Sequence, residues 1–466
     1  MCSAGVGRTG TYIGIDAMME GLEAEGRVDI YGYVVRLRRQ RCLMVQVEAQ
    51  YILIHQALLE HNQFGETEIT LPELHGTLST LKQSNSGSEP TLMEEEFDRL
   101  PSYNNWRTSN TGITEENKNK NRSSSVIPCE YQLNADDYNR VLLKLDEGHS
   151  HDSDPDEDDE DESSDEEDEE STKYINASHI DGYWGPRAFI VAQTPLPDTM
   201  ADFWSMVYQK KASIIIMLSD YSEGDKESDG VYWDKDKKTF GECEVEVTST
   251  DTSPTFVTRN MLIRHVKRKE SRPVKQFQLL KWGSGEVPEK PQDLTDMIKG
   301  IKNTCGSSKS QRNIPIVVHC NNGSSRSGIF CALWNVLDSA ETEKLVDVFQ
   351  VAKTLRKERQ GMLSGLEQYQ FLYDALEAVF PVQNGDVKAE QVPAVVEVVN
   401  ETKAAEEKAE QPASSTPNGQ QVAAENTPVG DGEKENKNQE PEKVSSAPTE
   451  TSPEDTSKGA ILTVEV

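Results

Sequence analysis

The sequence predicts an α/β or α+β fold, a mixed sheet flanked by helices, followed by an acidic tail without fixed structure. Short β-branched runs at residues 213–218 and 314–318 alternate with helical patterns at 199–208 and 344–359. This alternation is typical of one large sheet covered by helices. From residue 383 onward the chain has no Phe, Trp or Tyr and a net charge of −10. Such a composition cannot bury enough apolar surface to fold.

Three helices are predicted ahead of the sheet region. Apolar residues at helical spacing mark residues 11–22, 28–38 and 50–59. Because no strand precedes them, three helices alone make a poor independent domain. A polar stretch at 82–90, which contains Gly and Ser, separates them from the region that begins near Met93.

Acidic side chains are concentrated in two segments. The chain holds 81 acidic and 48 basic residues, a net charge of −33. Residues 146–170 contain 17 Asp or Glu and no Lys or Arg, and without this run and the tail the net charge is −6. We expect the run to be an insertion in a surface loop. The overall charge argues against nucleic-acid binding, which needs a surplus of Lys and Arg.

Hydropathy and cysteine usage limit the location and the kind of site. No apolar run reaches the ~20 residues that a bilayer crossing requires, and the first residues do not form a signal peptide. The seven cysteines are scattered without a C-x-x-C pair. This pattern argues against a disulfide framework or a zinc site and favours a reducing compartment. We expect no metal and no cofactor.

Two short segments carry the strongest functional signal. Residues 1–10 read MCSAGVGRTG and residues 319–328 read HCNNGSSRSG, so both follow Cys-x5-Arg-[Thr/Ser]-Gly. The second lies between the apolar run 314–318 and a helical run at 329–337, which predicts a strand, a loop and a helix. Such a loop aims backbone N–H groups and a helix N-terminus at one point, where an anion is held. The arginine can bind two oxygens of that anion, and the same field lowers the pKa of the thiol.

These loops supply the candidate site residues. The candidate catalytic residues are the nucleophilic thiols, the anion-binding arginines and the hydroxyls that can donate to sulfur: Cys2, Cys320, Arg8, Arg326, Thr9 and Ser327. The residues between them are expected to bind phosphate: Ser3, Ala4, Gly5, Val6, Gly7, Asn321, Asn322, Gly323, Ser324 and Ser325. A single Cys-x5-Arg arises by chance, and a buried Cys is commonly only a small hydrophobe. Two copies favour the functional interpretation, and the nucleotide-binding G-x4-G-K-[ST] is absent.

The CSAGVGRTG segment resembles the signature loop of the class I, cysteine-based protein tyrosine phosphatases. Other segments resemble the receptor-type members of that family: residues 31–58, FDRLPSY at 97–103, YINAS at 174–178, AQTPLPDTMADFW at 192–204 and RQGMLSGLEQYQFLYDAL at 359–376. The resemblance covers roughly residues 1–382. It implies the family's fold, a central twisted mixed sheet flanked by helices. It also implies hydrolysis of phosphotyrosine on proteins through a phosphocysteine intermediate.

The resemblance implies a domain organisation as well. It makes residues 1–64 the C-terminal remnant of a first phosphatase domain and 65–92 a linker. Residues 93–382 then form a second, degenerate phosphatase domain with the acidic insertion 146–170, and residues 383–466 a disordered tail. In the family, a W-P-D loop that precedes the Cys supplies an aspartate that protonates the leaving phenolate. No such loop precedes Cys2 here.

In the first copy, Gln46 and Gln50 resemble the family's water-positioning glutamines. The resemblance therefore implies an active parent protein, with its chemistry on Cys2 and Arg8, and a weak or inactive chain as given.

The second domain departs from the family pattern at three places. Trp282, Gly283 and Ser284 align with W-P-D, and serine cannot act as a general acid near neutral pH. A serine, Ser123, stands where an aromatic ring would stack on phosphotyrosine.

The first water-positioning glutamine is replaced by Ser364, whereas Gln368 survives. Glu286 lies two residues beyond Ser284 and is a candidate substitute for the acid. We expect a domain that binds phosphate and regulates; in the alternative interpretation Arg326 only pins its own loop.

Two classes of function remain open. One is a receptor-type tyrosine phosphatase, and the other is a non-catalytic scaffold that holds phosphoproteins. Dual-specificity phosphatases are a more distant alternative, because their domains are shorter and lack a YINAS-like segment. The resemblance implies phosphotyrosine proteins as substrates, Src-family kinases among them, and a place on the cytoplasmic side of the plasma membrane.

Two further partners are predicted from the acidic segments. Ser153, Ser163 and Ser164 each have a carboxylate three residues downstream, a pattern that acidophilic serine kinases favour. A solvated charge run is the alternative. The last three residues, 464–466, resemble a ligand for PDZ-type domains, which add such a terminus as a strand. An untethered end is the default for so short a pattern.

Overall fold

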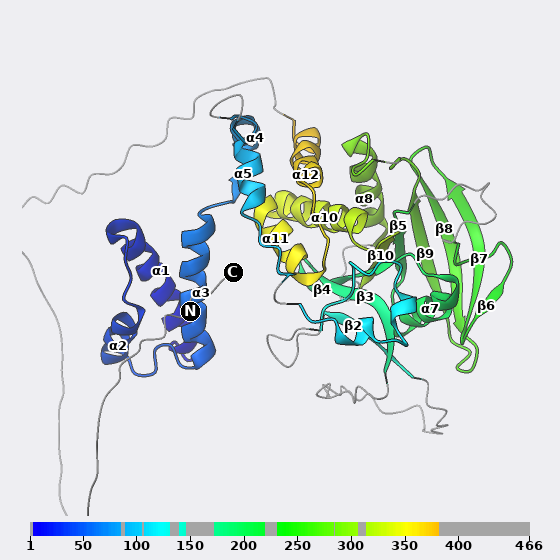
Figure 1. Cartoon of the computed structure of the whole chain (residues 1–466), viewed down its shortest axis with the longest axis horizontal. Helices are drawn as coiled ribbons and strands as arrows, with labels where there is room; N and C mark the ends of the chain where they lie inside the picture. The colour runs from blue at the N-terminus through cyan, green and yellow to red at the C-terminus, as the bar shows by residue number, and fades with distance from the viewer. Residues whose placement is uncertain are drawn as a thin grey trace, which may run out of the picture. The chain divides into compact units, whose positions relative to one another are not determined.

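The structure, a computed structural model, describes residues 3–84, 89–104, 107–130, 139–145, 172–219, 231–283, 285–305 and 314–381. The described residues belong to one compact unit, which lies within residues 1–383 (Figure 1). The predicted tail and the acidic insertion lie outside the described residues, and so do Cys2 and Ser284.

A mixed sheet forms the centre of the first unit. Its nine described strands have the order β2-β3-β4-β10-β5-β9-β8-β7-β6. They are β2 (Arg140–Lys144), β3 (Thr172–Gly182), β4 (Gly185–Gln193), β5 (Ile214–Met217), β6 (Lys238–Phe240), β7 (Cys243–Thr252), β8 (Phe256–His265), β9 (Ser271–Leu279) and β10 (Ile316–Cys320). Strand β10 is parallel to β4 and β5, and β5 is parallel to β9, whereas the other pairs are antiparallel. This confirms the predicted sheet with flanking helices.

Helices cover both faces of the sheet. Successive residues of a strand point to opposite faces, so neighbouring residues of one strand contact different helices. Ile216 and Val318 pack into the core that contains α8 (Pro291–Cys305), α10 (Ser325–Glu343), α11 (Val348–Glu358) and α12 (Leu366–Val379). On the opposite face, Val317 packs with Trp204 of α7 (Met200–Gln209). Helix α10, which follows the second loop, is buried along most of its length (Figure 1).

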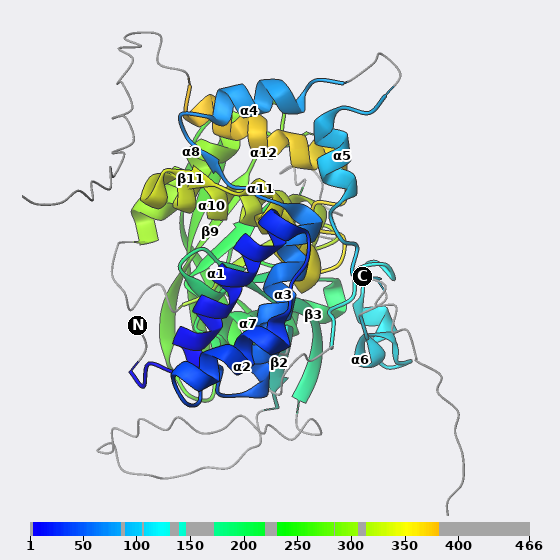
Figure 2. The same ribbon diagram turned by 90° about the vertical axis from the view of Figure 1, so that its left-hand side faces the viewer.

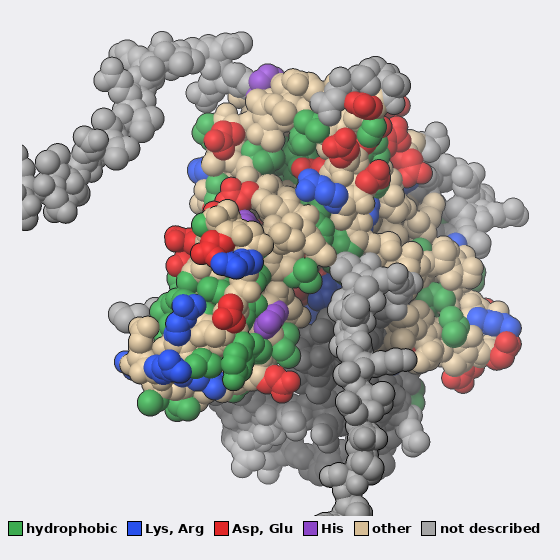
Figure 3. Space-filling model, turned by 60° about the vertical axis from the view of Figure 1, so that its left-hand side comes forward, with side chains coloured by type: hydrophobic (Ala, Val, Ile, Leu, Met, Phe, Trp, Pro, Cys, Tyr) green, Lys and Arg blue, Asp and Glu red, His purple; other side chains and the backbone are tan. Residues whose placement is uncertain are grey.

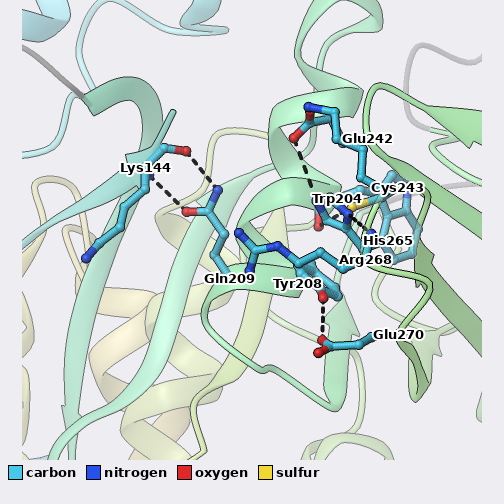
Figure 4. A network of polar contacts seen from close by, with 10 residues as sticks. Lys144, Trp204, Tyr208, Gln209, Glu242, Cys243, His265, Arg268 and Glu270 are labelled. Carbon is cyan, nitrogen blue, oxygen red and sulfur yellow. Dashed lines mark hydrogen bonds and ion pairs between the residues drawn. The ribbon is translucent and has the colours of Figure 1, made fainter. Parts of the chain in front are cut away.

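The C-terminal end of α7 is fixed by polar contacts on two sides (Figure 4). The Tyr208 hydroxyl donates to a Glu270 carboxylate oxygen at 2.6 Å, and the Tyr208 ring packs against His265 with ring centres 4.9 Å apart. Burial, followed by Glu270, raises the pKa of Tyr208 to about 12, so the phenol stays protonated. Gln209 bonds to both the N–H and the carbonyl of Lys144, at 2.9 and 3.0 Å. The end of β2, where the acidic insertion begins, is therefore anchored to α7.

The three predicted N-terminal helices are confirmed as α1 (Gly7–Glu25), α2 (Ile30–Gln40) and α3 (Glu48–Phe64). They share a small core that includes Met18, Val34 and Ile54. Large apolar side chains remain on their surface (Figure 3), among them Tyr12 and Tyr31, which are 72% and 73% exposed.

The two loop segments and their helices form an internal repeat without gaps. Aligning Cys2 with Cys320 places α1, α2 and α3 on α10, α11 and α12. Tyr12 and Tyr31 then correspond to Phe330 and Phe349, both fully buried. Among the described residues, the N-terminal helices therefore expose positions whose counterparts in the second copy are buried in the main core.

The stretch predicted as a linker contributes to the main core. Strand β1 (Ile69–Thr70) pairs with β11 (Leu345–Val346), and α4 (Leu74–Leu81) buries Leu74 and Leu78 beside α12 (Figures 1 and 2). Helix α5 (Leu92–Asp98) follows and is capped by Thr91. The single helix predicted over 344–359 is wrong at its start, because 345–346 form β11. Helix α11 begins only at Val348, where the Asp347 side chain accepts the N–H of Gln350 at 2.8 Å.

Candidate functional site

The second loop joins β10 to α10 in the strand–loop–helix arrangement that the sequence predicts. Gly323 lies at its turn with a φ of +70°, and its N–H donates to the carbonyl of Cys320 at 3.0 Å. A β-carbon at this position would lie 2.5 Å from the backbone nitrogen of Gln193 in β4. Only glycine therefore allows the loop to lie against the neighbouring strand. The Cys320 side chain is buried at the base of the loop.

A buried arginine holds the loop from behind. Arg359 donates to the carbonyl of Gly323 at 2.5 Å, to the hydroxyl of Ser178 at 2.8 Å and to the amide oxygen of Asn176 at 2.7 Å. Burial lowers the pKa of Arg359 to about 10, so the side chain is still a cation at neutral pH. The sequence analysis missed this residue. The repeat was the available signal, because Arg41 has the same spacing and donates to the carbonyl of Ala4 at 3.2 Å.

The centre of the second loop is occupied by a side chain of the loop itself. The amide oxygen of Asn322 accepts the N–H of Ser324 at 2.9 Å and the N–H of Ser325 at 3.2 Å. It also accepts the thiol of Cys320 at 3.3 Å. The amide nitrogen of Asn322 donates to the hydroxyl of Ser325 at 2.9 Å. The sequence analysis assigned phosphate binding to these residues but gave the Asn322 side chain no role.

Arg326 binds backbone carbonyls in this structure. It donates to the carbonyl of Leu218 at 3.0 Å and to that of Gly283 at 2.8 Å, and its guanidinium carbon lies 5.2 Å from the centre of the Trp282 ring. Arg326 therefore ties the second loop to the two loops that follow β5 and β9. A hydrogen bond from Ser327 to the sulfur, which the sequence analysis expects, is not formed in this structure. The Ser327 hydroxyl is buried and has no hydrogen-bond partner among the described residues.

The segment aligned with W-P-D has a conformation of its own. Gly283 has a φ of +74°, which proline, fixed near −65°, cannot adopt. Glu286 accepts a hydrogen bond from Gln368 at 2.7 Å. The structure thus brings the candidate substitute acid and the surviving glutamine together.

The segment that would recognise a phosphotyrosine ring lies beside the second loop. Arg122 donates to the carbonyls of Thr194 at 2.5 Å and Pro195 at 2.9 Å, directly after β4. Ser123 is half-buried, and its hydroxyl lies 2.8 Å from that of Ser125. A cleft of about 560 Å³ is lined by Ser125 and by residues of the loop, with Arg107, Arg356 and Ser364 among its other walls. Residue 123 is a serine, so its side chain has no ring to stack on a phosphotyrosine in this cleft.

A fully buried histidine stands directly before Cys320. The hydroxyl of Tyr232 lies 2.7 Å from Nε2 of His319, and Nδ1 of His319 lies 3.0 Å from the hydroxyl of Thr194. Gln276 donates to the Tyr232 hydroxyl at 2.6 Å, which leaves the Tyr232 proton for Nε2. Nδ1 therefore carries the ring proton and donates to Thr194. Burial, followed by the charge of Arg122, lowers the pKa of His319 to about 3, so the ring is neutral.

This neutral histidine should make the fold acid-sensitive. Because its pKa is lower in the folded state than the usual 6.5, the unfolded chain binds the proton first, and stability is lost as the pH falls from about 6.5 towards 3. At pH 4.5 the loss attributable to His319 is about 2–3 kcal/mol. Urea unfolding of the parent and of His319→Gln at pH 7.5 and 4.5 checks this. The variant should lose less stability by that amount, and equal losses in both proteins would contradict the assignment.

In the first copy, the described residues bring both glutamines to the start of α1. A β-carbon at Gly7 would lie 2.9 Å from Nε2 of Gln50 and 3.3 Å from Oε1 of Gln46. Oε1 of Gln50 accepts the N–H of Gln46 at 2.8 Å. Arg8 follows Gly7 and is exposed on the first turn of the helix. Gln46 and Gln50 therefore lie beside the end of the first loop, where Arg8 follows Gly7 in sequence.

Comparison with known proteins decides the family. The family model described as protein-tyrosine phosphatase matches residues 1–60 and 117–378, more than half of the chain. The chain belongs to the protein-tyrosine phosphatase family. Each of the two matched ranges contains one of the two Cys-x5-Arg loops.

Receptor-type phosphatases are among the similar proteins. Human receptor-type tyrosine-protein phosphatase C is 56% identical over 393 residues, which cover 83% of this chain and 30% of that protein. The rat protein of the same name is 51% identical over 454 residues, covering 96% and 35%. Mouse receptor-type tyrosine-protein phosphatase alpha is 35% identical over 378 residues, covering 81% and 42%. The chain spans about a third of the length of the phosphatase C relatives. Among the described residues, no helix is both long and apolar enough to span a bilayer.

Proposed function

We propose that this chain is part of a receptor-type tyrosine phosphatase that hydrolyses phosphotyrosine on proteins at its first signature loop. Cys2 attacks phosphorus and forms the phosphocysteine, and the phenolate leaves. Arg8 binds two phosphoryl oxygens, and Gln46 and Gln50 position the water that hydrolyses the intermediate. The carrying observation is the cluster of Gln46 and Gln50 around Gly7, next to Arg8. The names of the similar proteins favour this enzyme over a scaffold without catalysis.

We also propose that the second domain binds phosphate and regulates, with little turnover of its own. Two observations support the low turnover. The thiol of Cys320 and the guanidinium of Arg326 both contact groups of the protein itself. The segment at Gly283 has a backbone that proline cannot adopt. In this proposal residues 1–64 belong to the first domain and 65–92 connect it to the second domain, 93–382, with its insertion 146–170 and the tail 383–466.

Partners and location follow from the same proposal. The substrates are phosphotyrosine proteins, with Src-family kinases as the expected class, and the site of action is the cytoplasmic side of the plasma membrane. An acidophilic serine kinase is the proposed partner of the insertion at residues 146–170. The resemblance to receptor-type phosphatases supports the first two assignments, and the spacing of serines and carboxylates supports the third.

Turnover of aryl phosphates tests the proposal. These 466 residues should hydrolyse p-nitrophenyl phosphate about 10²–10⁴ times more slowly than receptor-type phosphatase alpha, because they contain no W-P-D motif to supply a general acid. With dinitrophenyl phosphate the difference in rate between the two proteins should be smaller, since its leaving group departs without a proton. Activity should disappear in Cys2→Ser and persist in Cys320→Ser. The reverse pattern would place the chemistry in the second loop and refute the proposal.

A further inference from the structure

The orientation of the Asn322 amide is fixed by its neighbours. Two backbone N–H groups, those of Ser324 and Ser325, point at the same atom of the side chain. That atom must be the oxygen, because an NH2 group there would face two donors without accepting from either. With the oxygen so placed, the NH2 group donates to the Ser325 hydroxyl. In this orientation the amide oxygen accepts every hydrogen bond that reaches it, and the amide nitrogen donates.

The Asn322 oxygen lies where an anion oxygen would be bound. The N–H groups at the start of a helix are the groups with which a Cys-x5-Arg loop holds a phosphate. Here the N–H groups of Ser324 and Ser325, together with the thiol of Cys320, converge on one neutral amide oxygen. A phosphate oxygen cannot use these donors until the Asn322 side chain leaves.

We propose that Asn322 is an internal ligand of the second loop, whose amide oxygen occupies the phosphate position and sets the affinity of the loop for anions. This inference rests on the proposed phosphate binding by the second domain. The first loop provides an internal comparison, because Ala4 occupies the corresponding position and has no polar side chain. The side chain that fills the second loop therefore has no counterpart at the same position of the first loop.

The contact with Cys320 has a second consequence. An amide oxygen only accepts hydrogen bonds, so the sulfur must donate its proton to it. A thiolate at Cys320 would face the oxygen without a donor between them. Asn322 therefore engages the sulfur of Cys320, which must leave this contact before it reacts. Removing the Asn322 side chain should open the anion position and make Cys320 more reactive.

Equilibrium dialysis with radiolabelled inorganic phosphate tests the proposal on the full chain. All variants carry Arg8→Ala, which removes the anion ligand of the first loop. Adding Asn322→Ala should tighten phosphate binding at least tenfold. Asn303→Ala is the matched control, because Asn303 is an exposed residue of the same type on α8, outside both loops; its phosphate affinity should stay within twofold. Asn322→Asp, which keeps the shape and adds a negative charge, should bind more weakly than the parent.

Alkylation of Cys320 by iodoacetamide, followed at the peptide level, gives an independent readout. The rate should rise at least fivefold in Asn322→Ala, and phosphate should slow it again. Equal phosphate affinity in the parent and Asn322→Ala, with binding lost in Arg326→Ala, would refute the role of Asn322 and leave the proposed phosphate binding intact. Absence of binding in every variant, Asn322→Ala included, would refute phosphate binding by the second domain itself.

Discussion

Replacing Arg359 with methionine should lower the free energy of unfolding by about 3 kcal/mol. The change leaves three buried acceptors, the carbonyl of Gly323 and the side-chain oxygens of Ser178 and Asn176, without their donor. Each orphaned group costs about 1–3 kcal/mol. Release of a desolvated cation, whose pKa burial has lowered, offsets part of this cost.

Urea unfolding followed by tryptophan fluorescence measures the loss. Lys357→Met is the matched control, since Lys357 is an exposed cation on the same helix. Its effect should stay within about 0.5 kcal/mol. Equal stability of the two variants would mean that the second loop does not depend on Arg359.

Replacing Gly323 with alanine should destabilise the fold by about 1–3 kcal/mol more than replacing Gly283. The two glycines have nearly the same φ, +70° and +74°, so both variants pay the same penalty of about 1–2 kcal/mol for a left-handed backbone. A β-carbon at Gly283 meets no atom within 4 Å, whereas one at Gly323 lies 2.5 Å from the nitrogen of Gln193. That nitrogen belongs to β4, which pairs with β10, so it cannot move freely. Overpacking of this kind adds about 1–3 kcal/mol.

Thermal and urea unfolding of the two variants isolates the steric part of the effect. Gly323→Ala should also lose phosphate binding at the second loop, while Gly283→Ala should not alter the loop's backbone. If both variants lost the same stability, the close approach of the loop to β4 would have no energetic role.

The chain's local patterns were sufficient for α1, α2, α3 and α7 and for the strand–loop–helix at Cys320, but α4, α5 and α8 were not predicted. Apolar spacing marks each predicted helix, and a β-branched run directly before the loop marks β10. Pairing between distant segments was not predictable in this way. Residues 344–359 have a continuous helical pattern, yet β1, some 275 residues earlier, pairs with 345–346 and delays the helix. Lys344 takes a left-handed backbone with a φ of +63° at that point.

The same limit applies to the site. The spacing of Cys320 and Arg326 predicts a loop whose backbone can bind an anion. It does not predict the direction in which a side chain within that loop points. Asn322 was therefore assigned with the other loop residues, although its amide oxygen fills the loop. Arg359 lies 39 residues after Cys320, and a contact at that separation is visible only when the repeat is aligned with Arg41.

The pairing of β1 with β11 defines how long a piece of this chain must be to fold on its own. The family match to the second domain begins at residue 117, yet Leu74, Leu78 and Met93 already belong to its main core. A protein that began at Met93 would expose the side of α12 that α4 covers and would leave β11 without its partner strand. We therefore expect that a fragment containing the main core needs the residues from Ile69 onward to fold, because residues 69–81 complete that core.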